Sequence, residues 1–279
     1  MRRGAAGDDA LARAYNRGLR AEKRGDLDAA AAAYLEVLRL DPDDHGGAAV
    51  RLAAIGRGAV PEKAPDAYVA TLFDQCAEQF DEMLVEQLGY SVPMLLRQRL
   101  LEIAPGPYPR MLDLGCGTGL TGASLADMAG EITGVDLAEG MLEQADERGI
   151  YRDLYVGEAV AFLQGTDEPA WDLITATDVL PYLGALEGFF AGAARCLAAG
   201  GVLAFSTETL PGMTGPGMAG PGMAGGYTVG PKHRFAHAEA YLRRVMADCG
   251  FRPLECAPIT VRYDDGAPVP GLLVLARGR

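Results

Sequence analysis

The sequence lacks several features that would assign it to common classes of protein. Its 279 residues include five cysteines, but none are paired at CxxC spacing or combined with histidine at the spacing of metal ligands. We therefore expect reduced, buried cysteines and no bound metal. No run approaches the roughly 18 apolar residues that a membrane span needs, and the opening residues lack the apolar core of a secretory signal. These absences predict a cytoplasmic protein that does not engage a membrane.

Basic residues are also scarce relative to acidic ones. The chain has 25 Lys and Arg against 38 Asp and Glu, which gives a formal net charge of -13. Proteins that bind nucleic-acid backbones usually present a basic face, so we expect no nucleic-acid partner. Lys232, His233 and Arg234 form the one tight cationic cluster late in the chain, and we interpret it as a solvated turn.

The N-terminal segment is rich in alanine and helical in pattern, with a break at residues 24–26. Gly18, Ala30, Tyr34 and Pro42 stand where a tetratricopeptide repeat of about 34 residues has a close helix contact, a small residue, an aromatic residue and a terminator. A generic alanine-rich helical hairpin is the alternative. Stacking needs about three repeats to bury the apolar faces. The segment must therefore pack on the next domain or on a partner.

The pattern changes along the rest of the chain. Residues 56–65 have the composition of a linker and suggest a hinge, and residues 66–104 are helical in pattern. Beyond them, short β-type runs alternate with helical stretches, which predicts a mostly parallel sheet covered by helices on both faces. We expect strands at residues 110–114, 131–137, 153–157, 171–176, 201–207, 253–262 and 271–276. The last two are too close for a crossover helix, so they should form a hairpin that makes the final strand antiparallel.

A low-complexity insert occupies residues 211–226, where three copies of a Pro-Gly-Met motif follow one another. This density of glycine and proline excludes a helix or a strand, so we interpret the insert as a mobile loop. It follows the C-terminal end of an expected strand, where ligands bind in sheets of this kind. The alternative is therefore a lid whose methionines contact an apolar substrate.

The strongest functional pattern is a glycine-rich turn after the first expected strand. Asp113 is followed by Gly115, Gly117 and Gly119, with Cys116 between the first two glycines. A side chain at the glycines would keep a ligand away from the backbone. The G-x-G-x-G spacing differs from the G-x-G-x-x-G of dinucleotide sites, and the Asp113 carboxylate would repel a pyrophosphate. A nicotinamide dinucleotide is thus disfavoured, and a ligand that carries an ammonium and a sulfonium group is favoured.

Acidic residues also follow the next two expected strands. Asp136 ends the second strand and is followed by Leu137, whereas Glu158 closes the third and precedes Ala159. A carboxylate at the first position can accept hydrogen bonds from both ribose hydroxyls, and one at the second can meet the adenine edge. Each acid alone is commonly a helix cap. Acids at the ends of three consecutive strands together indicate an adenosine ligand.

On these motifs the chain resembles the class I S-adenosylmethionine-dependent methyltransferases. Residues 176–180 are similar to the segment beside the methyl group, and residues 72–81 and 88–90 resemble the cap helices of those enzymes. With the repeat in front and residues 234–237 before the late helix, the whole chain resembles the predicted tetratricopeptide-repeat-containing methyltransferases.

The resemblance implies S-adenosyl-L-methionine as cofactor and a seven-stranded, mostly parallel Rossmann-like sheet with an antiparallel last strand. It divides the chain into a repeat-like segment at residues 1–60, cap helices at 66–104 and a methyltransferase domain at 105–279. The cofactor-binding residues that it implies are Asp113, Gly115, Cys116, Gly117, Gly119, Asp136, Leu137, Met141, Glu158, Ala159, Thr177 and Asp178.

The catalytic chemistry needs few side chains. A general base is required only if the acceptor atom carries a proton, and it would add about 10²–10⁴-fold to the rate. We expect His237 to be that base, followed by Asp178 and Tyr182. The chain has no Asn/Asp-Pro-Pro-Tyr/Phe motif, so methylation of an adenine amine or a glutamine amide is not expected.

Methyl transfer to an oxygen or nitrogen of a small molecule is the function that these patterns favour. Two alternatives stay open. One is a protein methyltransferase that holds its target through residues 1–60. The other is an interaction protein that binds the cofactor without turnover, against which the intact Asp113, Asp136 and glycine set argue.

Overall fold

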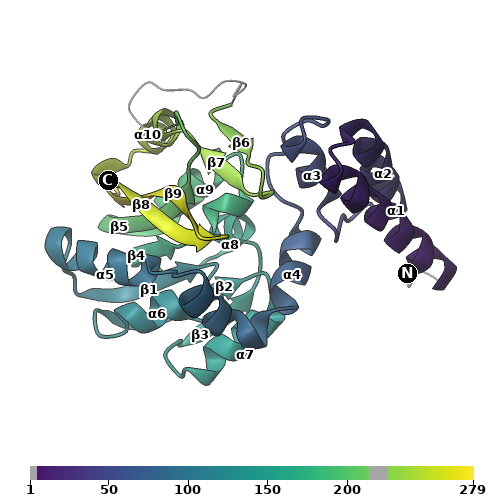
Figure 1. Ribbon diagram of the computed structural model, residues 1–279. Helices are drawn as coiled ribbons and strands as arrows, with labels where there is room; N and C mark the ends of the chain where they lie inside the picture. Colours follow the sequence, from purple (N-terminus) through teal and green to yellow (C-terminus); the bar gives the residue numbers. More distant parts are fainter. Residues whose placement is uncertain (1–4, 214–224) are drawn as a thin grey trace.

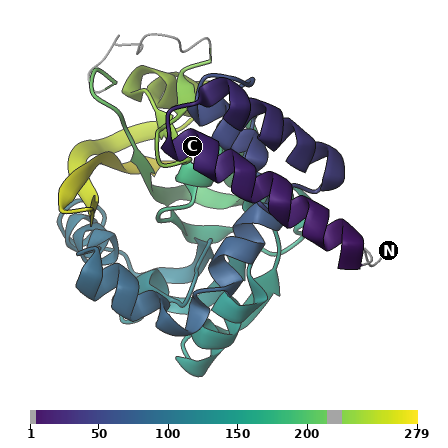
Figure 2. The ribbon, with the colours of Figure 1, turned by 45° about the vertical axis from the view of Figure 1, so that its right-hand side comes forward.

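The computed structural model describes residues 5–213 and 225–279. A helical N-terminal lobe stands beside a larger α/β body, in which helices cover a twisted sheet (Figures 1 and 2). Within the described ranges, no helix combines the length and the apolar character needed to cross a membrane. Most of the insert predicted at 211–226 lies outside these ranges, so its interpretation as a mobile loop stays a prediction.

The N-terminal lobe consists of α1 (Ala5–Lys23), α2 (Leu27–Leu40) and α3 (Ala48–Ala54). The first two helices form a hairpin, and a Cβ added to Gly18 would lie only 2.4 Å from Cε1 of Tyr34. The Tyr34 ring is fully buried and occupies this space, so only glycine fits at the helix contact. The helical character of the segment is confirmed, whereas its assignment to the tetratricopeptide repeats stays a prediction.

The N-terminal lobe shares an apolar core with the α/β body. Val50 of α3 packs in one cluster with Ala64, Val69, Val229 and Phe235. The last two residues belong to a hairpin of the body. Burial of these side chains ties the lobe to the body, since each buried aliphatic side chain contributes about 1.5–3 kcal/mol.

The segment after α3 is not the hinge that its composition suggests. The Ala64 N–H donates to the carbonyl of Tyr182 at 2.8 Å, and the Gly184 N–H donates to the carbonyl of Glu62 at 2.8 Å. Ala64 is buried. Backbone hydrogen bonds in both directions therefore fix residues 62–64 on the body.

Four short helices connect this segment to the sheet: α4 (Asp66–Asp74), the 3₁₀ turn η1 (Ala77–Gln79), the π-helical η2 (Glu82–Gln87) and α5 (Val92–Ile103). Leu96 and Leu100 of α5 are fully buried against the sheet. The first three elements lie over the C-terminal ends of the first strands, where they cover the candidate site.

The sheet contains nine strands within the described residues. They are β1 (Tyr108–Leu114), β2 (Ala129–Asp136), β3 (Asp153–Val156), β4 (Trp171–Ala176), β5 (Leu197–Glu208), β6 (Tyr227–Val229), β7 (Phe235–His237), β8 (Arg252–Asp264) and β9 (Ala267–Arg277). Strands β3, β2, β1, β4 and β5 are parallel neighbours in that order. Strand β9 continues the sheet antiparallel to β5 and pairs with β8 as a hairpin. This arrangement confirms the mostly parallel sheet with an antiparallel final strand.

Strands β6 and β7 were not expected from the sequence. They form a hairpin of their own, and β7 joins the sheet at a single pair, Ala236 with Glu208 at the end of β5. Each has only three residues, too few for an alternating pattern to stand out beside a glycine-rich run. This hairpin carries Arg234 to the candidate site.

Helices cover both faces of the sheet. They are α6 (Leu120–Leu125), α7 (Glu139–Glu147), α8 (Ala159–Gly165), α9 (Glu187–Cys196) and α10 (Glu239–Asp248), with a 3₁₀ turn η3 (Leu180–Tyr182). Helices α8, α9 and α10 bury their apolar side chains in one cluster, and α5 and α6 in another on the opposite face. The C-terminal ends of the parallel strands stay free of these layers and face the cap helices (Figure 1).

Candidate cofactor and acceptor site

The glycine-rich turn follows β1 directly. Gly115, Gly117 and Gly119 all have positive φ, at 57°, 54° and 90°, a region that other residues rarely adopt. A Cβ on Gly115 would lie 2.4 Å from Cγ2 of Val179, whereas the nearest atom to a Cβ on Gly117 is 3.9 Å away on Phe80. Gly115 thus allows close packing, and Gly117 leaves open space above the turn.

Asp113 lies beneath this turn and not in the space above it. Its carboxylate accepts hydrogen bonds from the Gly122 N–H at 3.1 Å, the Tyr151 hydroxyl at 2.8 Å and the Thr175 hydroxyl at 2.7 Å. Burial raises the pKa of Asp113 to about 6, although these donors oppose the shift. Because it is fully enclosed, Asp113 cannot contact a ligand ammonium group as expected. It holds the turn to helix α6 and strand β4.

Asp136 lies at the end of β2 beside the turn. One carboxylate oxygen accepts the Gly117 N–H at 2.8 Å and the other accepts the Ala138 N–H at 2.9 Å. Burial raises its pKa. Each oxygen keeps a free lone pair, because a carboxylate oxygen can accept two hydrogen bonds. The two oxygens are therefore positioned to receive a pair of hydroxyl groups.

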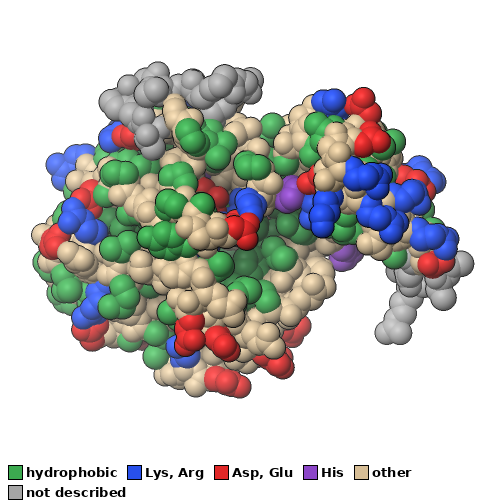
Figure 3. Space-filling model, viewed as in Figure 1, with side chains coloured by type: hydrophobic (Ala, Val, Ile, Leu, Met, Phe, Trp, Pro, Cys, Tyr) green, Lys and Arg blue, Asp and Glu red, His purple; other side chains and the backbone are tan. Residues whose placement is uncertain are grey.

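A cavity of about 280 Å³ opens above the turn. It brings together ten of the residues predicted from the sequence: Gly115, Cys116, Gly117, Asp136, Leu137, Glu158, Ala159, Thr177, Asp178 and Tyr182. The cap supplies an apolar wall from Phe73, Phe80, Met83, Leu84 and Leu88. Figure 3 shows hydrophobic side chains in the hollow at the centre of this face, between the body and the N-terminal lobe. The cavity is therefore apolar on the cap side and polar at the strand ends.

The cap is tied to the glycine-rich turn by polar contacts. The Thr118 hydroxyl and the Arg148 guanidinium both bind the carboxylate of Asp81, which lies between η1 and η2. Arg148 also donates to the carbonyl of Thr118. These bonds hold the cap over the turn.

Glu158 lines the cavity but already has partners. Its two carboxylate oxygens accept the Val160 and Ala161 N–H groups at 3.0 and 2.8 Å, so the side chain caps helix α8. Lys63 Nζ lies 4.0 Å from this carboxylate. The expected contact of Glu158 with the edge of an adenine ring stays a prediction.

Two further cofactor residues expected from the sequence do not line the cavity. Gly119 is the N-cap of α6, and its role is limited to the geometry of the turn. Met141 is fully buried and packs with Ala77 and Ala138 beneath α7. It faces inward because it belongs to the apolar side of that helix.

His237 was the first choice for a general base, and the structure contradicts it. The side chain is fully buried outside the cavity. Its Nε2 lies 2.9 Å from the carbonyl of Leu183 and 3.2 Å from that of Gly184, so Nε2 must carry the proton. Nδ1 lies 2.7 Å from the Thr207 hydroxyl. Burial lowers the pKa to about 4. His237 is thus a neutral structural residue.

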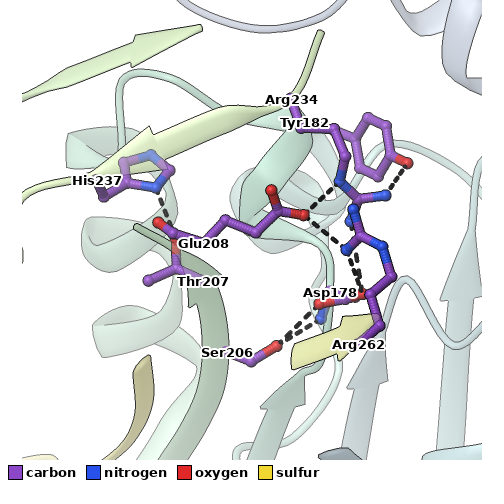
Figure 4. A network of polar contacts seen from close by, with 8 residues as sticks. All are labelled: Asp178, Tyr182, Ser206, Thr207, Glu208, Arg234, His237 and Arg262. Carbon is purple, nitrogen blue, oxygen red and sulfur yellow. Dashed lines mark hydrogen bonds and ion pairs between the residues drawn. The ribbon is translucent and has the colours of Figure 1, made fainter. Parts of the chain in front are cut away.

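The polar end of the cavity is a network of buried charges (Figure 4). Asp178 Oδ2 lies 3.5 Å from Arg234 Nη2 and 3.8 Å from Arg262 Nη1. Glu208 Oε1 lies 2.6 Å from Arg234 Nε and 2.7 Å from Arg262 Nη1. Arg234 also donates to the Tyr182 hydroxyl at 2.8 Å and lies over its ring. Two guanidinium groups and two carboxylates thus meet at one end of the cavity.

Asp178 has an unusual backbone conformation. Its φ is 59°, which costs about 1–3 kcal/mol for a residue other than glycine. Ser206 compensates, because its hydroxyl accepts the Asp178 N–H at 2.8 Å. Burial raises the pKa of the Asp178 carboxyl, and the neighbouring Arg234 and Arg262 oppose that shift. The chain therefore holds this carboxylate at the cavity at an energetic cost.

Sequence reasoning missed both arginines. The cluster at 232–234 was interpreted as a solvated turn, yet the Arg234 side chain is only 18% exposed, and Nε2 of His233 lies 3.3 Å from Glu22 of the N-terminal lobe. Arg262 was treated as the end of a strand. The available signal was a charged residue directly beside apolar strand residues, Phe235 in one case and Val261 in the other.

Comparison with known proteins agrees with this geometry. Residues 112–203 match the methyltransferase domain family. The chain is 31% identical over 105 residues to a ubiquinone biosynthesis O-methyltransferase of Burkholderia thailandensis, a match that covers 36% of this chain and 45% of that protein. It is 37% identical over 122 residues to a malonyl-[acyl-carrier protein] O-methyltransferase of Geobacter sulfurreducens, covering 42% and 46%. The chain thus spans less than half the length of these relatives.

Solved structures share the fold. The N-methyltransferase NodS from Bradyrhizobium japonicum, solved in complex with S-adenosyl-L-homocysteine, superposes with a TM-score of 0.50 at 19% identity over 67% of this chain and 85% of that protein. The sheet order, the glycine-rich turn and the matched segment all indicate a methyltransferase fold. The chain thus has the fold of these methyltransferases, and residues 112–203 within it match a methyltransferase domain.

Proposed function

We propose that this chain transfers a methyl group from S-adenosylmethionine to an oxygen or nitrogen of a small molecule. The observation that carries the proposal is the cavity itself. One continuous space joins Gly117 and Asp136, which suit an adenosine ligand, to Asp178 and Tyr182, which suit an acceptor. A protein that only bound the cofactor would have no need for the second half of this space.

The residues beside the turn fit the cofactor. A Cβ on Gly117 would project into the cavity, and the two free lone pairs of Asp136 suit the ribose hydroxyls. The Thr121 and Thr177 hydroxyls, 2.6 Å apart, add polar groups between the turn and the strand β4 end. When bound, S-adenosylmethionine supplies a methyl group on a sulfonium leaving group. The chain contributes placement, which can supply about 7–11 kcal/mol of barrier reduction.

Asp178 is the proposed general base for an acceptor that carries a proton. It lines the cavity, and its raised pKa makes it a better proton acceptor than an ordinary aspartate. Tyr182 is a poorer choice, because burial raises its pKa to about 12 and its hydroxyl is protonated at neutral pH. Its oxygen accepts a hydrogen bond from Arg234. We therefore assign Tyr182 to positioning Arg234.

A small acceptor is favoured over a protein. Both relatives named above are O-methyltransferases by name, which favours oxygen as the methylated atom. The cap helices cover the cavity on one side, and Lys63 and Ala64 of the connection after α3 form part of its wall. A cavity walled by the body, the cap and this connection suits a small acceptor better than an open surface that would receive a target protein.

The test is a transfer assay with a radiolabelled methyl donor. The full chain is incubated with S-adenosyl-[methyl-³H]methionine and a bacterial cell extract that contains both metabolites and proteins, and the products are separated by size. We expect label in small molecules, lost with Asp178→Asn if that carboxylate is the base. Label confined to macromolecules would favour the protein methyltransferase. Cofactor binding without any transferred label would contradict the proposal and favour an interaction protein.

A further inference from the structure

The polar end of the cavity contains a donor set that the methyl transfer itself does not require. Arg234 of the β6–β7 hairpin and Arg262 of β8 both line the cavity, and their side chains are only 18% and 7% exposed. Burying a cation costs several kcal/mol unless partners satisfy it. Two such cations at the wall of a cavity whose cap side is apolar therefore need a reason.

Glu208 anchors both guanidinium groups from behind the cavity. A single oxygen, Oε1, approaches both, at 2.6 Å from Arg234 Nε and 2.7 Å from Arg262 Nη1. Glu208 does not itself line the cavity. One carboxylate is thus shared between two cations and fixes their orientation (Figure 4). Asp178 is farther from both, at 3.5 and 3.8 Å, distances at which hydrogen bonds are weak.

Arg262 retains an unused edge. Its Nη1 faces Glu208 and Asp178, whereas its Nε and Nη2 have no hydrogen bond to any described residue. Neither group is among the buried polar atoms that lack a partner, and Arg262 lines the cavity, so both groups are open to a ligand from the cavity. The Nε and Nη2 groups are parallel donors in a planar fork, which matches the two oxygens of a carboxylate.

The backbone at Arg262 is shaped to aim this side chain. The pairing of β8 with β9 shifts register between Thr260 and Arg262, and bulges of this kind redirect side chains beside active sites. Val261 is fully buried in the apolar core next to it. Consecutive strand residues point to opposite faces, so Val261 fills the core and Arg262 reaches the cavity.

We infer that the acceptor carries a carboxylate and that the free edge of Arg262, supported by Arg234, binds it. The rest of the acceptor is apolar, because Val69, Leu84, Leu88 and Val179 line the adjoining space. The inference rests on the proposed function and specifies its substrate class: a small apolar carboxylic acid.

Calorimetry with carboxylate probes tests this directly. The full chain is saturated with S-adenosylhomocysteine and titrated with sodium hexanoate, octanoate and phenylacetate, and then with the corresponding neutral amides. We expect at least one acid to bind at least about tenfold more tightly than its amide. Equal affinity for acids and amides, or no binding of any acid, would overturn the inference. This comparison needs no variant.

Variants then assign the carboxylate to its partner. Arg262→Gln should weaken binding of the acid about tenfold or more, and Arg262→Lys should restore part of it as a point charge without the fork. Arg97→Gln is the control, since Arg97 also binds a carboxylate, that of Asp127, but lies outside the cavity. The substitutions at Arg262 and at Arg97 should both leave the affinity for S-adenosylhomocysteine unchanged.

The proposed function and this inference fail in different ways. If the wild-type chain does not bind S-adenosylhomocysteine, the methyltransferase proposal fails. The wild-type chain could instead bind S-adenosylhomocysteine, with Arg262→Gln lowering the affinity for this ligand and leaving the affinity for the acid probes unchanged. Arg262 would then hold the carboxylate of the cofactor, and the inference about the acceptor would be overturned.

Discussion

The imidazole Nε2 of His237 lies 2.9 Å from the backbone carbonyl of Leu183. This bond joins β7 to the turn that follows η3, and Leu183 also lines the cavity. A side chain placed in this way supports the acceptor end of the site from outside. It shapes the wall without touching a ligand.

His237→Gln should therefore destabilise the folded chain without lowering its affinity for the cofactor. Loss of a buried hydrogen-bonded partner costs about 1–3 kcal/mol, which chemical denaturation can measure. Calorimetry with S-adenosylhomocysteine should give the wild-type affinity. His45→Gln is the matched control, because the His45 side chain is 53% exposed and should change stability little. A stable variant that loses turnover but keeps both ligands would restore His237 as a catalytic group.

The pH dependence of the His237 contribution has a definite sign. The pKa is about 4 in the folded chain and 6.5 for the ordinary imidazole, so the unfolded chain binds more protons between these values. The stabilisation is present above pH 6.5 and is lost as the pH falls toward 4, by roughly 3 kcal/mol in all. The amount by which the unfolding free energy of the wild type exceeds that of His237→Gln should therefore shrink as the pH falls from 6.5 to 4. A constant difference would contradict the buried neutral imidazole.

Asp113 should give the opposite slope. Burial raises its pKa to about 6 in the folded chain from the ordinary 3.8, so here the folded chain binds more protons. Its contribution is most favourable below pH 3.8 and declines by roughly 3 kcal/mol as the pH rises through 6. Asp113→Asn removes this titration. The stability of the wild type relative to the variant should thus fall between pH 4 and 6, measured by urea denaturation of the cofactor-free chain.

The N-terminal lobe should be energetically part of the body. Arg51 of α3 is enclosed by Tyr15, Glu22 and His233, with its nitrogens 3.1 to 3.3 Å from their polar atoms. Breaking a partly buried pair of this kind costs up to about 3–5 kcal/mol. Arg51→Gln should lower the Tm clearly.

Arg57→Gln is the control for the lobe, since Arg57 bonds Asp28 at an exposed position and such pairs contribute about 0–1 kcal/mol. Equal effects of the two variants would show that the lobe is only loosely attached. Figure 3 shows other Lys and Arg side chains gathered over the outer face of the lobe, away from this junction.

The sequence predicted the features that depend on local patterns. The mostly parallel sheet followed from the alternation of strands and helices, the turn from three glycines, and the place of Asp136 beside the turn from its position at the end of β2. Features that depend on tertiary context were not visible. Asp113 and Asp136 both lie at the C-terminal end of a strand, yet only the packing of Tyr151 and Thr175 shows that the first points under the turn.

The acceptor end shows the same limit. His237 was chosen because histidine titrates near neutral pH, but burial between two backbone carbonyls removes that property. Arg234 and Arg262 come from distant segments, and only the three-residue hairpin and the bulge in β8 bring them together. Neither feature has a periodic pattern from which it could be predicted.

Asp136 provides the sharpest variant for the cofactor. If its two oxygens bind the ribose hydroxyls, Asp136→Ala should lower the affinity for S-adenosylhomocysteine by about one to three decades. Hydrogen bonds to a charged group contribute about 1.5–3 kcal/mol each. Circular dichroism should show an intact fold. Asp127→Ala is the control, because Asp127 is an exposed carboxylate outside the cavity. An unchanged affinity in Asp136→Ala would place the ribose elsewhere.

The central claim is that the space above Gly117 is a site for S-adenosylmethionine. Isothermal titration calorimetry of the purified full chain with S-adenosylhomocysteine and, separately, with NAD tests this claim most directly. The carboxylate of Asp113 is buried directly beneath the turn, where the negative charge of a pyrophosphate would be repelled. We therefore predict one site per chain for S-adenosylhomocysteine and no binding of NAD. Binding of NAD without binding of S-adenosylhomocysteine would contradict the account.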